Sequence, residues 1–458
     1  MLFQPIRPRI RIAVAGATSF GLALSMTACG GGDEGDDNGA TRTPASAAAV
    51  DCAQFSQYGD LKGKTISLYT GIVTPEDTAY KKSYEPFTNC TGVTIKYEGD
   101  KAFETQVLVR TQAGNPPDIA IVPQPGLLKQ LVATGKAVEA PAEVGANVDK
   151  FWGGAWRSYA TVDGKFYGAP SGASIKSLVW YSPAEFKEKG YTVPTTLDEL
   201  KTLTDKIVTD GKKPWCAGIS SGEATGWPLT DWMEDMMLRL SGPETYDKWV
   251  NHEIPFNGPE SIAALDAVGT YLKNPAYVNG GLGDVKSIAT TTFQEGGLPI
   301  LDGECSLHRQ ASFYAANFPK GTNVAENGDV FAFYLPSKDA TTKPLLGGGE
   351  FNVAFADRPE IKAFQLYLST DTWANIKAGL SQGWVSANKG IDPNNLSNPV
   401  DKLAAQLLLD PKATFRFDGS DQMPGAVGSN AFWKQSTTWL TGQDTKTTVD
   451  NIEKAWPK

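Results

Sequence analysis

The chain has 458 residues, more than a single hydrophobic core usually serves, so we expect two domains. Its formal net charge of −9 argues against nucleic acid or an anionic membrane surface as the binding target. The sequence contains two histidines and no C-x-x-C motif. A zinc or redox site is therefore not expected, and we predict that the protein uses no metal and no cofactor.

The first 28 residues have the pattern of an export signal. A basic segment (7–11) precedes an apolar stretch (12–26) that suits a signal peptide and is short for a membrane span. Met26-Thr27-Ala28 then precedes Cys29 as in a lipobox, so we expect cleavage before Cys29 and a lipid anchor on this cysteine. An ordinary secretory signal is the alternative. Residues 29–51 are mostly small and polar, which predicts a flexible tether.

Strand and helix patterns alternate in the first part of the folded body. Residues 64–70 (KTISLYT) alternate and are rich in β-formers, which predicts a strand, and a helical pattern follows at 75–87. Residues 94–97 predict a second strand, 103–112 a second helix, and 118–122 (DIAIV) a buried parallel strand. This series of βαβ units predicts an α/β fold.

The next element is a long extended stretch at 165–181, with small residues at its centre. It predicts a crossover from one lobe to another, with a hinge at Ser171–Ser174. Further along, 231–240 is predicted to be a helix, 298–301 an apolar strand, and 330–335 a second crossover.

Four cysteines remain after the lipidated one, and in an exported protein they predict disulfides. Cys52, Cys90, Cys216 and Cys305 allow three connectivities. We favour Cys52–Cys90, which would join the start of the folded body to the end of the first helix, and Cys216–Cys305 within one lobe.

Several short motifs occur in an order typical of a known family. They are NPPDI (115–119), YGAP (167–170), LVWY (178–181), and MP (423–424) followed by AFW (431–433). Over roughly residues 60–458 the chain thereby resembles the extracellular solute-binding protein family that contains the maltose-binding protein. Three further motifs resemble its α-glucoside-binding branch: GWPLTDW (226–232), GGGEF (347–351) and FRFD (415–418).

The resemblance implies a two-lobed α/β periplasmic-binding-protein fold with hinge crossovers. Lobe I would comprise 52–172 plus 334–388, and lobe II 173–333 plus 389–458. The implied function is capture of a sugar, an α-glucoside or oligosaccharide, in the cleft and its delivery to the permease subunits of an ABC importer. We expect a monomer without enzymatic activity, lipid-anchored to the outer face of the cell membrane.

A sugar site needs aromatic faces for the apolar side of the ring and planar polar groups for its hydroxyls. Trp433 resembles a stacking tryptophan of the maltose-binding protein, Trp227 follows a glycine in a predicted loop, and Glu350 follows three glycines. For the tryptophans the alternative is a core position, and for Asp231 it is a helix cap. The other candidates end strands, begin helices, or lie at the hinge and in loops: Thr70, Gly71, Asp100, Gln124, Ser174, Asp231, Arg309 and Asp421.

Two other functions compete with this interpretation. Glycoside hydrolysis needs two carboxylates across the scissile bond, whereas Asp231, Glu234 and Asp235 would lie side by side on one helix. No H-E-x-x-H or Walker A motif is present. An anchored glycosidase and a binding protein for a non-sugar solute, such as a peptide, polyamine or iron chelate, are the alternatives.

Overall fold

The computed structural model describes residues 50–152, 154–279, 284–381, 383–396 and 398–457. The predicted signal peptide, the lipidation site Cys29 and nearly all of the predicted tether lie outside these ranges. Within them, every helix is too short or too polar to cross a membrane.

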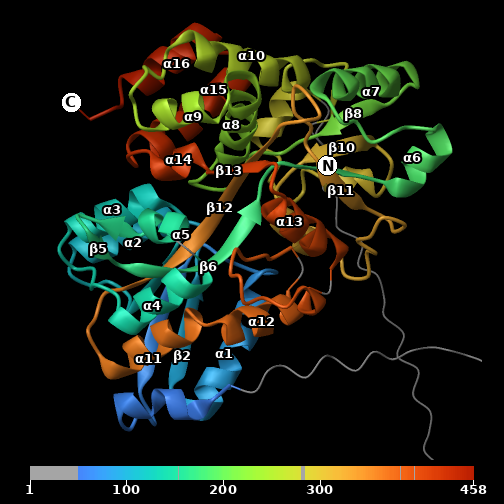
Figure 1. The fold of residues 1–458 in the computed structure, drawn as a ribbon. Helices are drawn as coiled ribbons and strands as arrows, with labels where there is room; N and C mark the ends of the chain where they lie inside the picture. The colour runs from blue at the N-terminus through green and yellow to red at the C-terminus, as the bar shows by residue number, and fades with distance from the viewer. Residues whose placement is uncertain (1–49, 153, 280–283, 382, 397, 458) are drawn as a thin grey trace, which may run out of the picture. The chain divides into compact units, whose positions relative to one another are not determined.

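A six-stranded sheet forms the centre of the first lobe (Figure 1). Its order is β13-β12-β3-β1-β2, and β6 also pairs with β12. Strands β1, β2 and β3 run parallel to one another, as the βαβ pattern predicts, while β12 is antiparallel to β3. The bounds are β1 Thr65–Thr70, β2 Thr94–Gly99, β3 Ile119–Val122, β6 Gly168–Ile175, β12 Lys343–Ala354 and β13 Ala413–Phe417.

Aromatic side chains fill a core between the first helix and the C-terminal helices of this lobe. Phe87 of α1 packs against Phe364 and Tyr367 of α11 at ring-centroid distances of 5.0 and 5.7 Å. The predicted disulfide Cys52–Cys90 joins η1 to α1 beside them, with a Cα–Cα distance of 5.3 Å. The bounds are η1 Cys52–Tyr58, α1 Asp77–Thr91, α2 Phe103–Gln112, α3 Pro125–Ala133, α4 Ala142–Phe151, α5 Gly154–Tyr159, α11 Pro359–Leu368 and α12 Asp371–Leu380, with the short strands β4 Thr161–Val162 and β5 Lys165–Phe166.

A five-stranded sheet of order β11-β7-β10-β8-β9 forms the second lobe. The predicted disulfide Cys216–Cys305 joins its neighbouring strands β8 and β10, with a Cα–Cα distance of 5.6 Å. The strands are β7 Leu178–Tyr181, β8 Lys213–Cys216, β9 Val278–Asn279, β10 Cys305–Arg309 and β11 Phe331–Tyr334. The helices are α6 Pro183–Lys189, α7 Leu197–Thr209, α8 Trp227–Ser241, α9 Pro243–Val250, α10 Pro259–Leu272, α15 Trp433–Leu440 and α16 Thr445–Glu453.

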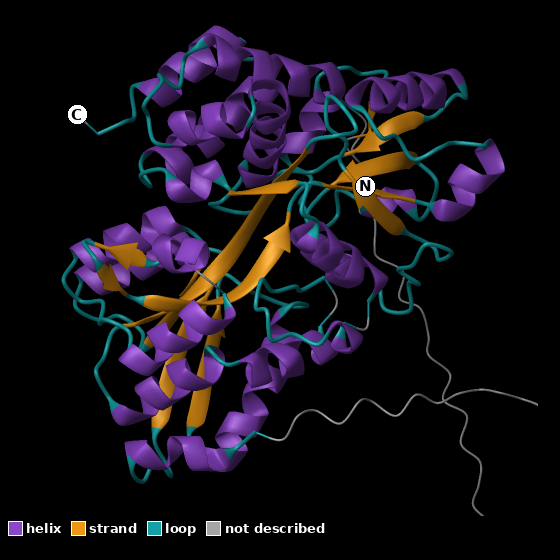
Figure 2. Ribbon diagram, in the orientation of Figure 1, coloured by secondary structure: helices purple, strands orange, loops and turns teal. Residues whose placement is uncertain are grey.

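Helix α8 is the central helix of this lobe, and each of its residues from Pro228 to Arg239 is buried. Helices α9, α10 and α15 pack around it. Figure 2 shows these helices gathered beside the second sheet, to its left in this view. A helix buried on all sides must neutralise its charged residues by internal partners, and this requirement shapes the functional site.

The lobes are connected by three segments of the described chain: the turn between β6 and β7, the stretch between β11 and β12, and the passage from β13 into α14 (Gly419–Gln422). The predicted hinge Ser171–Ser174 lies within β6, where it pairs with β12. The predicted second crossover at 330–335 is largely strand β11, and the crossing follows it. The predicted lobe bounds stay a prediction.

Two sequence-based predictions are wrong. The predicted strand at 298–301 is a short 3₁₀ helix, η3 (Leu298–Ile300), because Pro299 has no N–H to offer a sheet and fixes φ; the paired strand of this region is β10. The helix predicted from Asp231 begins earlier, at Trp227, because Pro228 is suited to a first helical turn. Asp231 is therefore not its cap.

Candidate functional site

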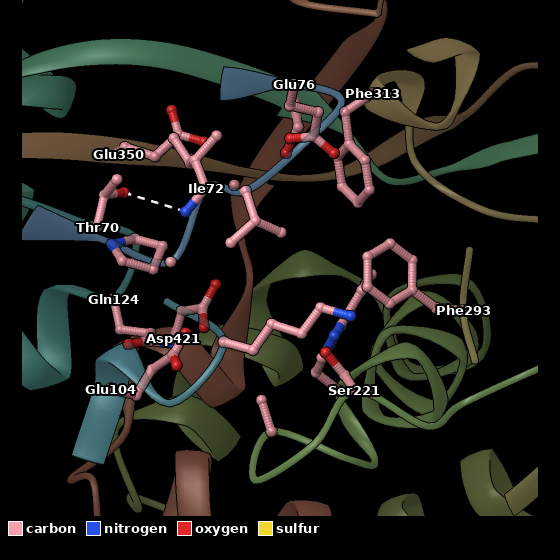
Figure 3. Close-up of a pocket in the computed structure, with 18 of the residues that line it drawn as sticks. Thr70, Ile72, Glu76, Glu104, Gln124, Ser221, Phe293, Phe313, Glu350 and Asp421 are labelled. Carbon is pink, nitrogen blue, oxygen red and sulfur yellow. Dashed lines mark hydrogen bonds between the residues drawn. The ribbon is translucent and has the colours of Figure 1, made fainter. Parts of the chain in front are cut away.

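A cavity of about 210 Å³ lies between the lobes at the carboxyl ends of β1 and β3 (Figure 3). Thr70 ends β1, Gln124 follows β3 as the N-cap residue of α3, and Glu104 lies in the first turn of α2. Because parallel strands end at one edge of their sheet, these side chains converge there. Glu76, at the start of α1, and Glu350, on β12, complete a wall of polar groups from the first lobe.

The second lobe supplies aromatic side chains to the same cavity. Trp227 contacts Phe293 and Phe313 at ring-centroid distances of 5.0 and 6.0 Å. Trp433, the first residue of α15, also lines the cavity and is buried. The two phenylalanines face Gln124 and Glu104 across the cavity in Figure 3.

Gly226 brings the two tryptophans onto one wall. Its φ of +115° lies in the left-handed region, and a Cβ there would come within 2.3 Å of the Trp433 carbonyl oxygen. Only glycine permits this approach of the α8 N-terminus to α15. The close contact with the Trp433 backbone therefore explains why a glycine precedes Trp227 in the sequence motif.

Some buried polar atoms on the cavity wall lack a hydrogen-bond partner within the described part of the chain. They include Oε1 of Gln124 and Nε1 of Trp433, each on a side chain about 4% exposed. An unsatisfied buried polar group costs roughly 1–3 kcal/mol. One acceptor and one donor are thus available to a ligand that carries hydroxyl groups.

Four carboxyl groups of the cavity have raised pKa values. Burial, reinforced by the neighbouring charge of Glu350, raises the pKa of Glu76 to about 7. Burial likewise raises the pKa of Glu104 to about 7, against the opposing effect of hydrogen bonds that include one from Gln124. Burial also raises the pKa values of Glu350 and Asp421. Near neutral pH Glu76 and Glu104 can therefore either donate to or accept from a polar ligand.

A buried ion cluster forms part of the cavity wall and extends behind it. Lys176 Nζ lies 3.0 Å from Asp231, 2.5 Å from Asp418 and 3.8 Å from Asp421. Burial alone would lower the pKa of Lys176, but these three carboxylates raise it well above its ordinary value. Arg309 extends the cluster by pairing with Asp231 at 3.2 Å. Burial raises the pKa of Asp231 to about 6, although Lys176 and Arg309 oppose the shift.

Helix α8 holds all three crossing segments by hydrogen bonds. Asp235 accepts from Ser177 at 2.6 Å in the first crossing, and Arg239 donates to the carbonyl of Leu335 at 2.6 Å in the second. Glu234 accepts from the N–H groups of Gly419 (2.6 Å) and Ser420 (3.0 Å) in the third. The carboxylates that the glycosidase alternative required are thus engaged in holding the lobes' connections.

Eight of the predicted ligand contacts line the cavity: Thr70, Gly71, Gln124, Ser174, Trp227, Glu350, Asp421 and Trp433. Asp231 and Arg309 lie behind its wall in the ion cluster. Asp100 accepts hydrogen bonds from the Tyr69 hydroxyl and the N–H of Ala102, at the start of α2.

The residues that line the cavity and that sequence reasoning missed include Glu76, Glu104, Lys176, Phe293 and Phe313. Glu76 and Glu104 start helices that follow strand ends, a signal that could have found them. Phe293 precedes η3 in an irregular segment, and Phe313 belongs to the short 3₁₀ helix η4 (Ser312–Asn317). Neither position carries a periodic signal.

Residues 218–222 (GISSG) match the G-x-S-x-G pattern of hydrolase nucleophiles. The pattern requires a histidine base beside the serine. Here His252 pairs with Glu453 at 2.9 Å, and His308 Nδ1 lies 3.0 Å from the Cys216 carbonyl oxygen. Both histidines are thereby committed elsewhere, so neither serves as the base of Ser220, the serine of the pattern. Its neighbour Ser221 is one of the cavity's wall residues.

The sequence profile of the bacterial extracellular solute-binding proteins matches residues 70–344, so the chain belongs to this family. The family is one of binding proteins. It is exported, and its two-lobed α/β fold is the one observed here.

Two curated relatives are similar along most of the chain. The alpha-glucosides-binding periplasmic protein AglE of Rhizobium meliloti is 39% identical over 420 residues, which are 88% of this chain and 89% of the relative. The osmoprotective compounds-binding protein GgtB of Synechocystis sp. is 36% identical over 407 residues, 87% of this chain and 94% of the relative.

Solved structures share the fold at lower identity. The bacterial solute receptor AcbH, described as preferring β-D-galactopyranose, has a TM-score of 0.72 and 18% identity, covering 85% of this chain and 98% of its own. Maltose-bound MalE3 of T. maritima has a TM-score of 0.66 and 17% identity, covering 86% and 98%. At this identity the likeness extends to the fold.

Proposed function

We propose that this protein is the substrate-binding component of an ABC importer and that it captures a carbohydrate, an α-glucoside or a related oligosaccharide. The observation that carries the proposal is the cavity itself, in which an aromatic wall faces a wall of carboxyl and amide groups. This pairing suits a sugar, whose ring has an apolar face and whose edge carries hydroxyls. The similarity to AglE, named for α-glucosides, supports the choice of sugar.

In the proposed complex a sugar ring lies against Trp227 and Trp433 of the second lobe. Its hydroxyls bond to Gln124, Glu350 and Asp421, and satisfy the orphaned Oε1 of Gln124 and Nε1 of Trp433. Thr70, Gly71 and Ser174 complete the proposed contacts. Asp231 and Arg309 act through Lys176 by holding it in place. Asp100 stays a prediction as a ligand contact.

A lobe-bridging ligand favours the closed arrangement, because it binds that arrangement better than the open one. A permease that recognises the closed form then receives loaded protein in preference to empty protein. We include in the proposal a monomeric state, a signal peptide over 1–28, and a lipid on Cys29 that keeps the protein at the membrane. Incorporation of labelled palmitate into the wild type, and its loss in Cys29→Ser, would test the anchor.

A second candidate ligand class is a small osmoprotective solute, favoured by the 36% identity to GgtB. The cavity of about 210 Å³ would hold such a solute without a second sugar ring. In that case the ligand's polar groups would bond to the same carboxyl wall.

Titration calorimetry distinguishes these possibilities. The exported chain is titrated with maltose, trehalose, sucrose and isomaltose, and in parallel with glycine betaine and an amino acid. We expect saturable binding of at least one α-glucoside, with the sugar recovered intact. Binding of betaine or the amino acid without any sugar would overturn the carbohydrate proposal, and release of glucose would overturn the binding-only function.

A further inference from the structure

A second cavity, of about 250 Å³, borders the first on the side of α1 and α12. Pro75, Glu76, Ser174, Phe313 and Glu350 line both cavities. Each cavity alone is smaller than the roughly 300–1,000 Å³ of a typical small-molecule site, and the two together fall within that range. The shared walls make the pair a single binding space with two compartments.

The second compartment contains a buried lysine without an ion-pair partner in the described part of the chain. Lys377 of α12 is 1% exposed, and its ammonium group donates to the Ser381 hydroxyl. It also lies over the rings of Tyr80 and Trp384, 4.0 and 4.9 Å from their centroids. Burial lowers the pKa of Lys377 to about 7, although the charges of Glu350 and other carboxylates oppose the shift. A buried amine with spare donors is costly to keep unless it has a further role.

Trp384 adds a second unsatisfied donor to this compartment. Its side chain is 7% exposed, and Nε1 has no hydrogen-bond partner among the described residues. Trp373 packs edge-on against its ring at a centroid distance of 5.9 Å, so the ring is held in place.

Gly172 of β6 allows Trp384 and Glu350 to approach each other. A Cβ at this position would lie 2.5 Å from Trp384 Nε1 and 2.8 Å from Glu350 Oε2. The donor of Trp384 and the acceptor of Glu350 are therefore presented together at the boundary between the compartments.

We propose that the second cavity is a subsite for the second ring of a disaccharide, in which Lys377 and Trp384 donate hydrogen bonds to its hydroxyls. Tyr80 and Trp384 provide the aromatic surface, and Glu350 contacts both rings from the shared wall. The inference rests on the proposed function and extends it: the protein selects a disaccharide over a monosaccharide.

The test is calorimetry with glucose and maltose on the wild type and on two variants, Trp384→Phe and Lys377→Met. Trp384→Phe keeps an aromatic ring and removes Nε1. Each variant should weaken maltose binding by about 3- to 10-fold, the range for one lost hydrogen bond, while glucose affinity changes less than about 2-fold. Trp439→Phe is the matched control, because the Nε1 of this buried tryptophan is already bonded to Thr445 at 3.1 Å.

Five outcomes of this experiment are informative. Selective loss of maltose binding in both variants supports the subsite. Equal loss for glucose and maltose, or no loss for either in Trp384→Phe with an unchanged melting temperature, overturns it. Equal affinity of the wild type for glucose and maltose overturns the subsite alone and leaves the proposed function standing. Absence of binding by glucose and by every disaccharide overturns the proposed function and the subsite together.

Discussion

Replacing Lys176 with methionine should strongly destabilise the protein. The side chain is 10% exposed and faces Asp231, Asp418 and Asp421 at 3.0, 2.5 and 3.8 Å. Methionine preserves most of the volume but leaves these carboxylates without their shared cation. Removing one partner of a buried ion pair costs about 3–5 kcal/mol. We expect a loss of that size at pH 7.5 in the free energy of unfolding.

The loss should shrink at low pH, and this dependence identifies its origin. Without Lys176 the carboxylates hold protons more tightly when folded than when unfolded, so acid favours the folded variant. Urea denaturation of wild type and variant at pH 7.5 and pH 5 measures both quantities. Lys201→Met is the control, because its ion pair with Asp205 is exposed and should contribute less than about 1 kcal/mol. A loss below that of the control, or one identical at both pH values, would refute the reasoning.

The remaining predictions concern the ligand, the pH dependence and the first disulfide. Trp433→Ala should weaken sugar binding by about 1–3 kcal/mol in calorimetry, by loss of buried aromatic surface; an unchanged Kd in a folded variant would contradict its placement. The pKa of Glu104 rises from 4.5 to about 7 on folding, so the folded state takes up a proton in that window and stability falls as pH increases through it. Glu104→Gln should flatten the melting temperature over this range, and an identical slope would argue against the shift. Replacing Cys52 and Cys90 together with serine should cost about 2–4 kcal/mol by urea denaturation, since the bond closes a loop of sequence separation 38; a smaller change would mean that the unfolded chain is little constrained by it.

Local sequence patterns predicted the first lobe well, because its strands and helices have clear hydrophobic patterns. The apolar run at 118–122 became the fully buried strand β3, and the helix predicted at 103–112 has the bounds of α2. Predictions were wrong where the structural effect of a proline was misjudged, because proline can either interrupt a strand or begin a helix. Pro299 interrupts what looked like a strand, whereas Pro228 starts a helix that looked like a loop.

The cavity was predictable where a motif or a strand end marks it, as at Gln124 and Trp433. It was not predictable where long-range packing decides. Asp231 and Arg309 were candidates for ligand contact, but α8 is buried on all sides. Asp231 of α8 therefore pairs with Lys176 and with Arg309 of β10. Phe313 reaches the cavity because η4, which follows β10, is packed against it, and no local pattern contains that information.

The separation of aromatic and polar side chains onto opposite cavity walls has a consequence for capture of the ligand. Trp227 and Trp433 lie on one lobe, and Gln124 and Glu104 on the other. A deoxygenated sugar analogue could still stack on the tryptophans of the second lobe. It would lack the hydroxyl groups that form hydrogen bonds with the polar wall of the first lobe. Such a compound would occupy the binding site while the two lobes stay in the open arrangement. It would therefore inhibit uptake of the sugar without being transported itself.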